Sequence, residues 1–226
     1  MTLKFIKNGV NFMKIITLAT SLCGLSSNHA LAASIPAPKE DEQLASQSGS
    51  QTIVLAGGCF WGVQAVFQHT KGVTKAISGY AGGSADTAHY EMIGTGKTGH
   101  AEVVKVTYDP SKITLGKILK IYFAVAHNPT ELNHQGYDVG TQYRSAIFYS
   151  NPEQKRISES YINQLNQDKV FSDPIVTTLE ALNEFYQAED YHQDYVKSHP
   201  GNPYVARNDL PKIVNLEKEF PELYVK

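Results

Sequence analysis

The sequence predicts an α+β domain of two layers, in which a single sheet is covered by helices. From residue 51 onward, short β-branched runs of strand length alternate with runs of helix length, and no internal repeat is present. The stretch from residue 51 to the end, roughly 175 residues, is long enough for one domain with a sizeable core. Alternation of this kind suits a sheet packed with helices, while it leaves the pairing order of the strands open.

The first half of this region holds three predicted strands and one helix. The strands cover residues 52–56, 73–78 and 100–108, because each is a short run rich in β-branched or alternating apolar residues. Residues 63–67 suit a helix that begins soon after the first strand. The segment between that strand and that helix is therefore predicted to be a strand-to-helix turn.

The second half of this region is predicted to contain two longer helices and two further strands. Thr114 is a suitable N-cap for a helix over residues 115–126, and Asn151 followed by Pro152 begins a helix that extends to about residue 166. In chain order, the other predicted elements are strands over residues 144–149 and 175–180, a short helix over residues 189–197 and an irregular tail from residue 201.

The N-terminus has the features of a secretory signal peptide over residues 1–32. Lysines precede a short apolar core at residues 15–25, and an Ala-Leu-Ala cleavage pattern ends at Ala32. The core is shorter than the roughly 20 residues that span a bilayer, so no stable membrane insertion is expected after cleavage. We therefore expect a periplasmic or secreted protein. Residues 33–50 are rich in Ser, Ala, Pro and Gln and are predicted to be a flexible linker.

Composition and spacing argue against nucleic acid, metal ions and nucleotides as ligands. The net charge is −2 and no basic block is present, so nucleic acid is not an expected partner. The eight histidines lack close ligand spacing, and one remaining thiol is too few for structural zinc. Gly-Thr-Gly-Lys-Thr at residues 94–98 superficially resembles a phosphate-binding loop, but it lacks the earlier glycine and precedes a strand.

The predicted turn at residues 57–62 reads Gly-Gly-Cys-Phe-Trp-Gly and carries the candidate nucleophile, Cys59. A thiol at the start of a helix is expected to lose its proton more easily than a free thiol. Phe60 and Trp61, the only tryptophan, could form an apolar wall beside the sulfur. The other cysteine, Cys23, lies in the segment expected to be removed, so Cys59 cannot form an internal disulfide and is either buried or reactive.

Several polar residues are candidates to act with this thiol. If Glu102 points into the Cys59 pocket from its strand, burial would raise its pKa and keep it protonated as a proton donor, whereas an outward side chain would simply be solvated. Tyr90, Asp138 and Tyr143 lie in or beside loops, and tyrosine hydroxyls can donate to a developing oxyanion. His192 is a structural hydrogen-bonding residue, a base or neither.

Four motifs in register resemble the class A peptide methionine sulfoxide reductases. They are Gly-Gly-Cys-Phe-Trp-Gly at 57–62, Gly-His-Ala-Glu at 99–102, Gly-Thr-Gln-Tyr-Arg-Ser-Ala-Ile at 140–147 and Ala-Glu-Asp-Tyr-His-Gln-Asp-Tyr at 188–195. The resemblance covers about residues 52–195, places the catalytic domain at residues 51–200, and implies a two-layer α/β sandwich with a ferredoxin-like β-α-β-β-α-β core.

The resemblance also implies a role for each candidate. Cys59 would attack the sulfoxide sulfur, Phe60 and Trp61 would hold the methyl group, and Glu102 would give a proton to the oxygen. Tyr90 and Tyr143 would hydrogen-bond that oxygen, with Asp138 assisting its polarisation. Methionine would leave and Cys59 would become a sulfenic acid.

One departure from the family concerns the tail, residues 201–226. Many members carry resolving cysteines there, whereas this chain has Val205 and no cysteine after Cys59. The resemblance therefore implies an external thiol reductant, namely a thioredoxin-like protein, a glutaredoxin or a small thiol, and no bound cofactor. Two alternatives stay open: a thiol peroxidase that reduces peroxide at Cys59, and a non-catalytic module that binds methionine-rich segments through the aromatic pocket.

Overall fold

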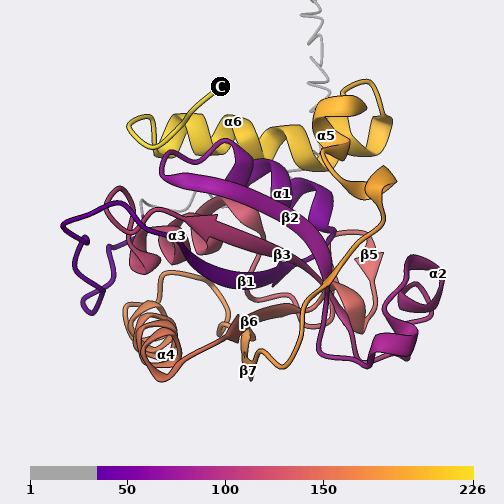
Figure 1. Ribbon diagram of the computed structural model, residues 1–226, viewed down its shortest axis with the longest axis horizontal. Helices are drawn as coiled ribbons and strands as arrows, with labels where there is room; N and C mark the ends of the chain where they lie inside the picture. Colours follow the sequence, from indigo (N-terminus) through magenta and orange to yellow (C-terminus); the bar gives the residue numbers. More distant parts are fainter. Residues whose placement is uncertain (1–34) are drawn as a thin grey trace, which may run out of the picture. The chain divides into compact units, whose positions relative to one another are not determined.

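The protein, described by a computed structural model over residues 35–226, is an α+β domain with helices packed on one central sheet (Figure 1). This arrangement confirms the predicted fold class. The predicted signal peptide at residues 1–32 lies outside the described residues. Within residues 35–226, no helix combines the length and apolar character that crossing a bilayer would require.

The central sheet has the strand order β7-β6-β1-β3-β2-β8. Its strands, in chain order, are β1 (Gln51–Gly57), β2 (Val73–Ala81), β3 (Ala101–Tyr108), β6 (Ser145–Tyr149), β7 (Thr178–Ala181) and β8 (Tyr186–Gln187). All neighbouring strands are antiparallel except β6 and β7. Leu55 of β1 lies opposite both Val104 of β3 and Ile147 of β6, so β1 is a central strand with partners on both sides.

The helices cover one face of this sheet. They are α1 (Phe60–Gln68), α3 (Leu115–Ile121), α4 (Pro152–Gln167) and α6 (Leu210–Glu219). Outside this layer lie the short helices α2 (Tyr90–Ile93) and α5 (Tyr195–Ser198). The small hairpin of β4 (His134–Gln135) and β5 (Asp138–Val139) also lies outside it. Ile53 and Leu55 of β1 and Val104 of β3 pack with these helices in the main core. In chain order the main elements are β1, α1, β2, β3, α3 and β6, with α2 between β2 and β3.

The opposite face of the sheet is covered by chain instead of helix. Its small and apolar side chains, among them Val54, Ala56 and Val103, form a second cluster with Leu182 and Phe185 from the segment between β7 and β8. Because strand residues alternate between faces, Glu102 of β3 shares the helix-covered face with Val104. This parity directs a carboxyl group toward the start of α1.

Most predicted elements are present, with shifted ends. The predicted helix over residues 115–126 is α-helical to Ile121 and continues as a π-helical turn over Tyr122–Ala126. The predicted helix over residues 189–197 is divided into a 3₁₀ turn, Asp190–His192, and α5. Asp194, between them, has a positive φ of 55°, and this left-handed residue interrupts the helix.

The prediction of an irregular tail from residue 201 onward is wrong, because much of this segment is helical. A π-helical turn over Val205–Asp209 leads into α6, which lies beside α1 in Figure 1 (yellow beside indigo). Leu216 and Phe220 are buried in the main core, and Leu210 and Ile213 pack against a small cluster with Ala65 of α1. Apolar residues at these spacings form a helical stripe, although a proline at the start and many charges obscure the pattern.

Residues 35–50 lack helices and strands but pack on the domain, in place of the flexible linker that composition predicts. Ile35 is buried, and the Tyr161 hydroxyl donates to the Pro36 carbonyl over 2.7 Å. Asp41 and Glu42 each accept a 2.8 Å hydrogen bond from a backbone N–H in the first turn of α3. These carboxylates satisfy helix N–H groups that have no partner within the helix, which explains why a polar segment is held in place.

Candidate active site

Cys59 occupies the N-cap position of α1, at the turn between β1 and α1, and its side chain is partly exposed. The preceding residue, Gly58, has a positive φ of 82°, and a Cβ atom there would lie 2.6 Å from Cγ of Gln135. A Cβ on Gly57 would lie 2.9 Å from the His127 ring. The glycines therefore let the β4 strand and His127 approach the turn that presents the thiol.

The Cys59 thiol does not have the low pKa that its place at a helix start predicts. Burial raises its pKa well above the ordinary value, and the negative charges of Glu102 and Asp209 raise it further. The backbone N–H of Trp61 and the charge of Lys212 act in the opposite direction with smaller effect. The loss of hydration therefore outweighs the helix terminus, and the resting thiol is protonated at neutral pH.

Glu102 points into the site from β3 and is buried, in keeping with the inward orientation considered from the sequence. Its Oε2 accepts a 3.0 Å hydrogen bond from the backbone N–H of Phe60, the residue after Cys59. Burial raises the pKa of Glu102 to about 8, against the lowering effect of that hydrogen bond and with a further increase from Asp138. At neutral pH this carboxyl group is mostly protonated and can donate a proton.

The two aromatic residues after Cys59 have different environments. Phe60 is fully buried, with its ring centroid 5.8 Å from that of Tyr80 and 5.1 Å from that of His192. Trp61 is half-buried, and its indole stacks on Tyr195 at 3.7 Å with an interplanar angle of 8°. Phe60 thus supports the site from within the core, while Trp61 offers an apolar surface near the thiol.

His192 holds Trp61 in place. The indole Nε1–H of Trp61 donates to Nδ1 of His192 over 3.1 Å, which places the histidine proton on Nε2. Burial lowers the pKa of His192, so the ring stays neutral at physiological pH. Of the three roles left open for His192, the structure gives it that of a hydrogen-bonding residue.

Tyr90, Asp138 and Tyr143 come from three separate segments. The two tyrosines lie near Cys59 and Glu102, and Asp138 lies near Glu102. The Tyr90 ring lies 4.4 Å from the His192 ring. Burial and the charges of Glu102 and Cys59 raise the pKa of both tyrosines, and Asp138 acts on both as well. Both hydroxyls therefore stay protonated and can donate hydrogen bonds. Together with Cys59, Phe60, Trp61, Glu102 and His192, these residues make up the eight candidates from the sequence, and the structure places them at one site.

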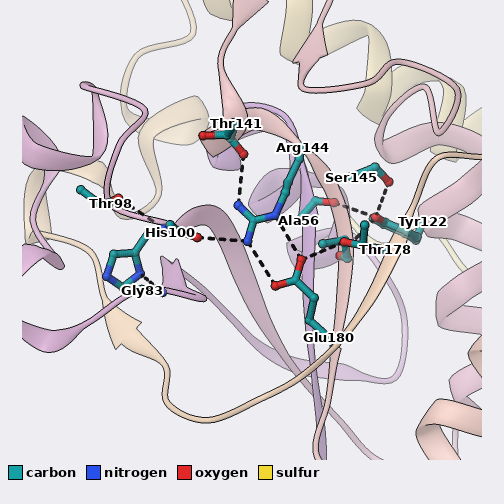
Figure 2. A network of polar contacts seen from close by, with 12 residues as sticks. Ala56, Gly83, Thr98, His100, Tyr122, Thr141, Arg144, Ser145, Thr178 and Glu180 are labelled. Atoms are coloured by element: carbon teal, nitrogen blue, oxygen red, sulfur yellow. Dashed lines mark hydrogen bonds and ion pairs between the residues drawn. The ribbon is translucent and has the colours of Figure 1, made fainter.

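Arg144 forms polar contacts with the loop before β3, with Thr141 and with Glu180 of β7 (Figure 2). Its guanidinium donates to the carbonyl oxygens of Thr141 at 3.1 Å and Gly99 at 3.2 Å. It also forms a two-pronged ion pair with Glu180 of β7, at 3.1 and 3.2 Å. This planar fork fixes the loop before β3 against the loop before β6.

Three residues of the site were not predicted from the sequence, namely Tyr195 and Tyr204 beside Trp61 and Asp209 near Cys59. The Tyr204 ring meets Trp61 edge-on at 5.8 Å, and its hydroxyl donates to Asp138. Tyr195 ends the motif at residues 188–195, but the sequence does not indicate that its ring stacks on Trp61. Tyr204 and Asp209 lay in the tail that was expected to be irregular.

Among the described residues, no group of three or more His, Cys, Asp or Glu side chains gathers in a way that could hold a metal ion. Polar and aromatic groups converge instead on one sulfur atom. Such a site can deliver a thiol, a proton and two neutral hydrogen-bond donors to a small polar group beside an apolar surface.

Comparison with known proteins gives the same family over almost the whole domain. A family profile described as peptide methionine sulfoxide reductase matches residues 51–223. Peptide methionine sulfoxide reductase MsrA 2 of Mesorhizobium japonicum is 61% identical over 176 residues, which cover 78% of this chain and 90% of the relative. The protein of the same name from Synechocystis is 45% identical over 174 residues, covering 77% and 81%.

Solved structures that resemble this protein belong to proteins of the same kind. Mxr1 from Saccharomyces cerevisiae in its reduced form is 32% identical with a TM-score of 0.60, covering 72% of this chain and 91% of that one. Methionine sulfoxide reductase A of Corynebacterium diphtheriae is 36% identical with a TM-score of 0.56, covering 69% and 77%. From the matched profile, the identities and the shared fold, this chain belongs to the peptide methionine sulfoxide reductase family.

Proposed function

We propose that the protein reduces methionine S-sulfoxide, free or in proteins, to methionine, with Cys59 as the nucleophile and Glu102 as the acid. The observation that carries this proposal is the 3.0 Å hydrogen bond from the Phe60 N–H to Glu102. This bond holds a largely protonated carboxyl group against the backbone of Phe60, the residue that follows Cys59. A sulfoxide oxygen is a poor leaving group until it is protonated, so the reaction needs a thiol and an acid in this arrangement.

In the first step, the Cys59 sulfur attacks the sulfoxide sulfur while Glu102 gives a proton to the sulfoxide oxygen. Tyr90 and Tyr143 donate hydrogen bonds to that oxygen, and Asp138 assists its polarisation. Trp61 receives the methyl group on its indole, and Phe60 backs it from the core. The hydroxyl group then moves from the substrate sulfur to the Cys59 sulfur while the new bond between the two sulfur atoms breaks. Methionine leaves and Cys59 becomes a sulfenic acid. The proton of the Cys59 thiol passes to the Glu102 carboxylate, so atoms and protons balance.

In the second step, an external thiol resets Cys59. The sequence holds no cysteine besides Cys23 and Cys59, so a resolving thiol within the domain is not available. One thiol attacks the sulfenic sulfur to give a mixed disulfide and water, and a second thiol releases Cys59 and forms a disulfide. A thioredoxin-like protein, a glutaredoxin or a small thiol would supply these electrons, with no bound cofactor.

The protein would do this outside the cytoplasm, on oxidised exported proteins. Support for this location comes from the predicted signal peptide at residues 1–32 alone.

Turnover of the two epimers of an N-acetylated methionine sulfoxide, with dithiothreitol as reductant, tests the proposal. We expect multiple turnovers of the S epimer only, lost in Cys59→Ser and retained in the matched surface variant Ser172→Ala. Turnover of peroxide but of neither sulfoxide would favour a thiol peroxidase. Folded protein that binds sulfoxide peptides without turnover of either substrate would favour a binding module.

A further inference from the structure

Asp209, at the start of α6, is a fully buried carboxylate without a hydrogen-bond partner. Neither of its oxygen atoms has one among the described residues, and its exposed fraction is 0%. Aspartate at this N-cap position would normally accept a hydrogen bond from its own helix, yet Asp209 makes no such bond. A buried polar group without partners calls for a specific explanation.

The Asp209 side chain is directed at the helix that begins with Cys59. A Cβ atom on Gly62, in the first turn of α1, would overlap Oδ1 of Asp209 and lie 2.9 Å from Nζ of Lys212. Lys212 is one turn further along α6, and its Nζ lies 3.9 Å from Oδ1 of Asp209. An opposite pair of charges therefore packs directly on the turn that holds the nucleophile.

We propose that Asp209 and Lys212 are positioning residues that set how readily the Cys59 thiol gives up its proton. The inference rests on the proposed role of Cys59 and assigns this pair a function within that same site. Beyond the larger effect of burial, the charge of Asp209 disfavours the thiolate, while the charge of Lys212 opposes Asp209 and favours the thiolate. Because the thiolate is the form that oxidants attack, a protonated resting state protects an exported enzyme between turnovers.

Glu102 and Asp209 are the two carboxyl groups whose charges raise the pKa of Cys59. Glu102 faces the thiol from β3, but at neutral pH it is mostly protonated because its pKa is raised to about 8. Burial raises the pKa of Asp209 to about 6, against the attraction of Lys212 and with a further increase from Asp138 of β5, so Asp209 is mostly ionised at pH 7. Tyr90, Tyr143 and Tyr204 are neutral because their pKa values are raised.

The test is the pH dependence of Cys59 alkylation by iodoacetamide in the full chain, followed on the Cys59 peptide by mass spectrometry. Asp209→Asn should shift the midpoint down by roughly one pH unit, and Lys212→Met should shift it up. The double variant should return close to wild type. Below about pH 6, where Asp209 takes up its proton, the rates of wild type and Asp209→Asn should converge. Glu217→Gln, which removes an exposed carboxylate from the same helix, should leave the profile unchanged.

Coincident profiles for folded Asp209→Asn and wild type would overturn the proposal and leave Asp209 a structural residue that affects the melting temperature only. If Asp209→Asn does not fold, Lys212→Met decides, since an unchanged midpoint in that variant also overturns the proposal. Alkylation needs no sulfoxide, so this result is independent of whether the protein proves to be a reductase.

Discussion

The backbone N–H of Phe60 and the Oε2 of Glu102 are joined by a 3.0 Å hydrogen bond that connects the start of α1 to the middle of the sheet. This bond places an acid next to the residue that follows Cys59, although the two are far apart in sequence. It also opposes the effect of burial, because an accepted N–H bond lowers the pKa of a carboxyl group. The carboxyl group titrates at about 8 as a result of both influences.

Replacing Glu102 by Gln should reduce kcat for sulfoxide reduction by roughly 10²- to 10⁴-fold, because the amide keeps the Phe60 hydrogen bond but cannot donate an acidic proton. Wild-type activity should fall as pH rises through about 8, where Glu102 loses its proton. The residual activity of Glu102→Gln should lack this alkaline limb. An identical limb in both proteins would assign it to another group.

The same substitution should stabilise the protein at alkaline pH. The pKa of Glu102 is raised from 4.5 to about 8, so the folded state favours the proton and loses stability as pH rises from about 4.5 through 8. The full loss is about 5 kcal/mol at most. Denaturant unfolding of Glu102→Gln and wild type should agree near pH 4 and diverge by pH 9, with the variant more stable. Glu91→Gln, an exposed carboxylate in α2, should show no such divergence.

The sequence marked Glu102 as a candidate through its local motif but left its orientation open, and the structure shows that the side chain is buried and points toward the start of α1. The raised pKa of Cys59 could not be predicted from the sequence, because it depends on tertiary burial of the thiol and on charged groups from β3 and from the start of α6. The Trp61 environment is also a tertiary property: His192, Tyr195 and Tyr204 reach the indole from the C-terminal part of the chain. Helix α6 was missed because its apolar stripe is divided among charges and becomes evident only against α1.

Gly58→Ala should destabilise the fold and disturb the thiol turn. Alanine would have to adopt the positive φ of 82° that Gly58 has, and its Cβ would lie 2.6 Å from Cγ of Gln135. Together these two effects should lower the free energy of unfolding by roughly 1–3 kcal/mol. Gly136→Ala is the matched control, because its φ of 57° is also positive while nothing lies within 4 Å of the added atom. Urea unfolding should show the larger loss for Gly58→Ala, and equal losses would mean that the Gln135 contact is relieved easily.

His192→Ala should loosen Trp61 and weaken substrate binding. The indole N–H would lose its 3.1 Å acceptor, so we expect KM for the sulfoxide to rise several-fold while kcat changes less. Because Trp61 is the only tryptophan, its fluorescence reports on this site directly and should shift toward longer wavelength. His69→Ala, at the far end of α1, is the control. An unchanged emission spectrum in His192→Ala would show that stacking on Tyr195 alone fixes the indole.

Asp41→Ala should lower the stability of the domain by roughly 1–2 kcal/mol, because the N–H of Gly116 and the Thr114 hydroxyl at the start of α3 would both lose an acceptor. Glu40→Ala is the matched control from the same segment. It removes an ion pair with Arg156 in which both side chains are about half exposed, and pairs of that kind contribute little. Thermal unfolding should therefore separate the two variants. Equal melting temperatures would mean that residues 35–50 lie on the domain without stabilising it, which is the behaviour expected of a free linker.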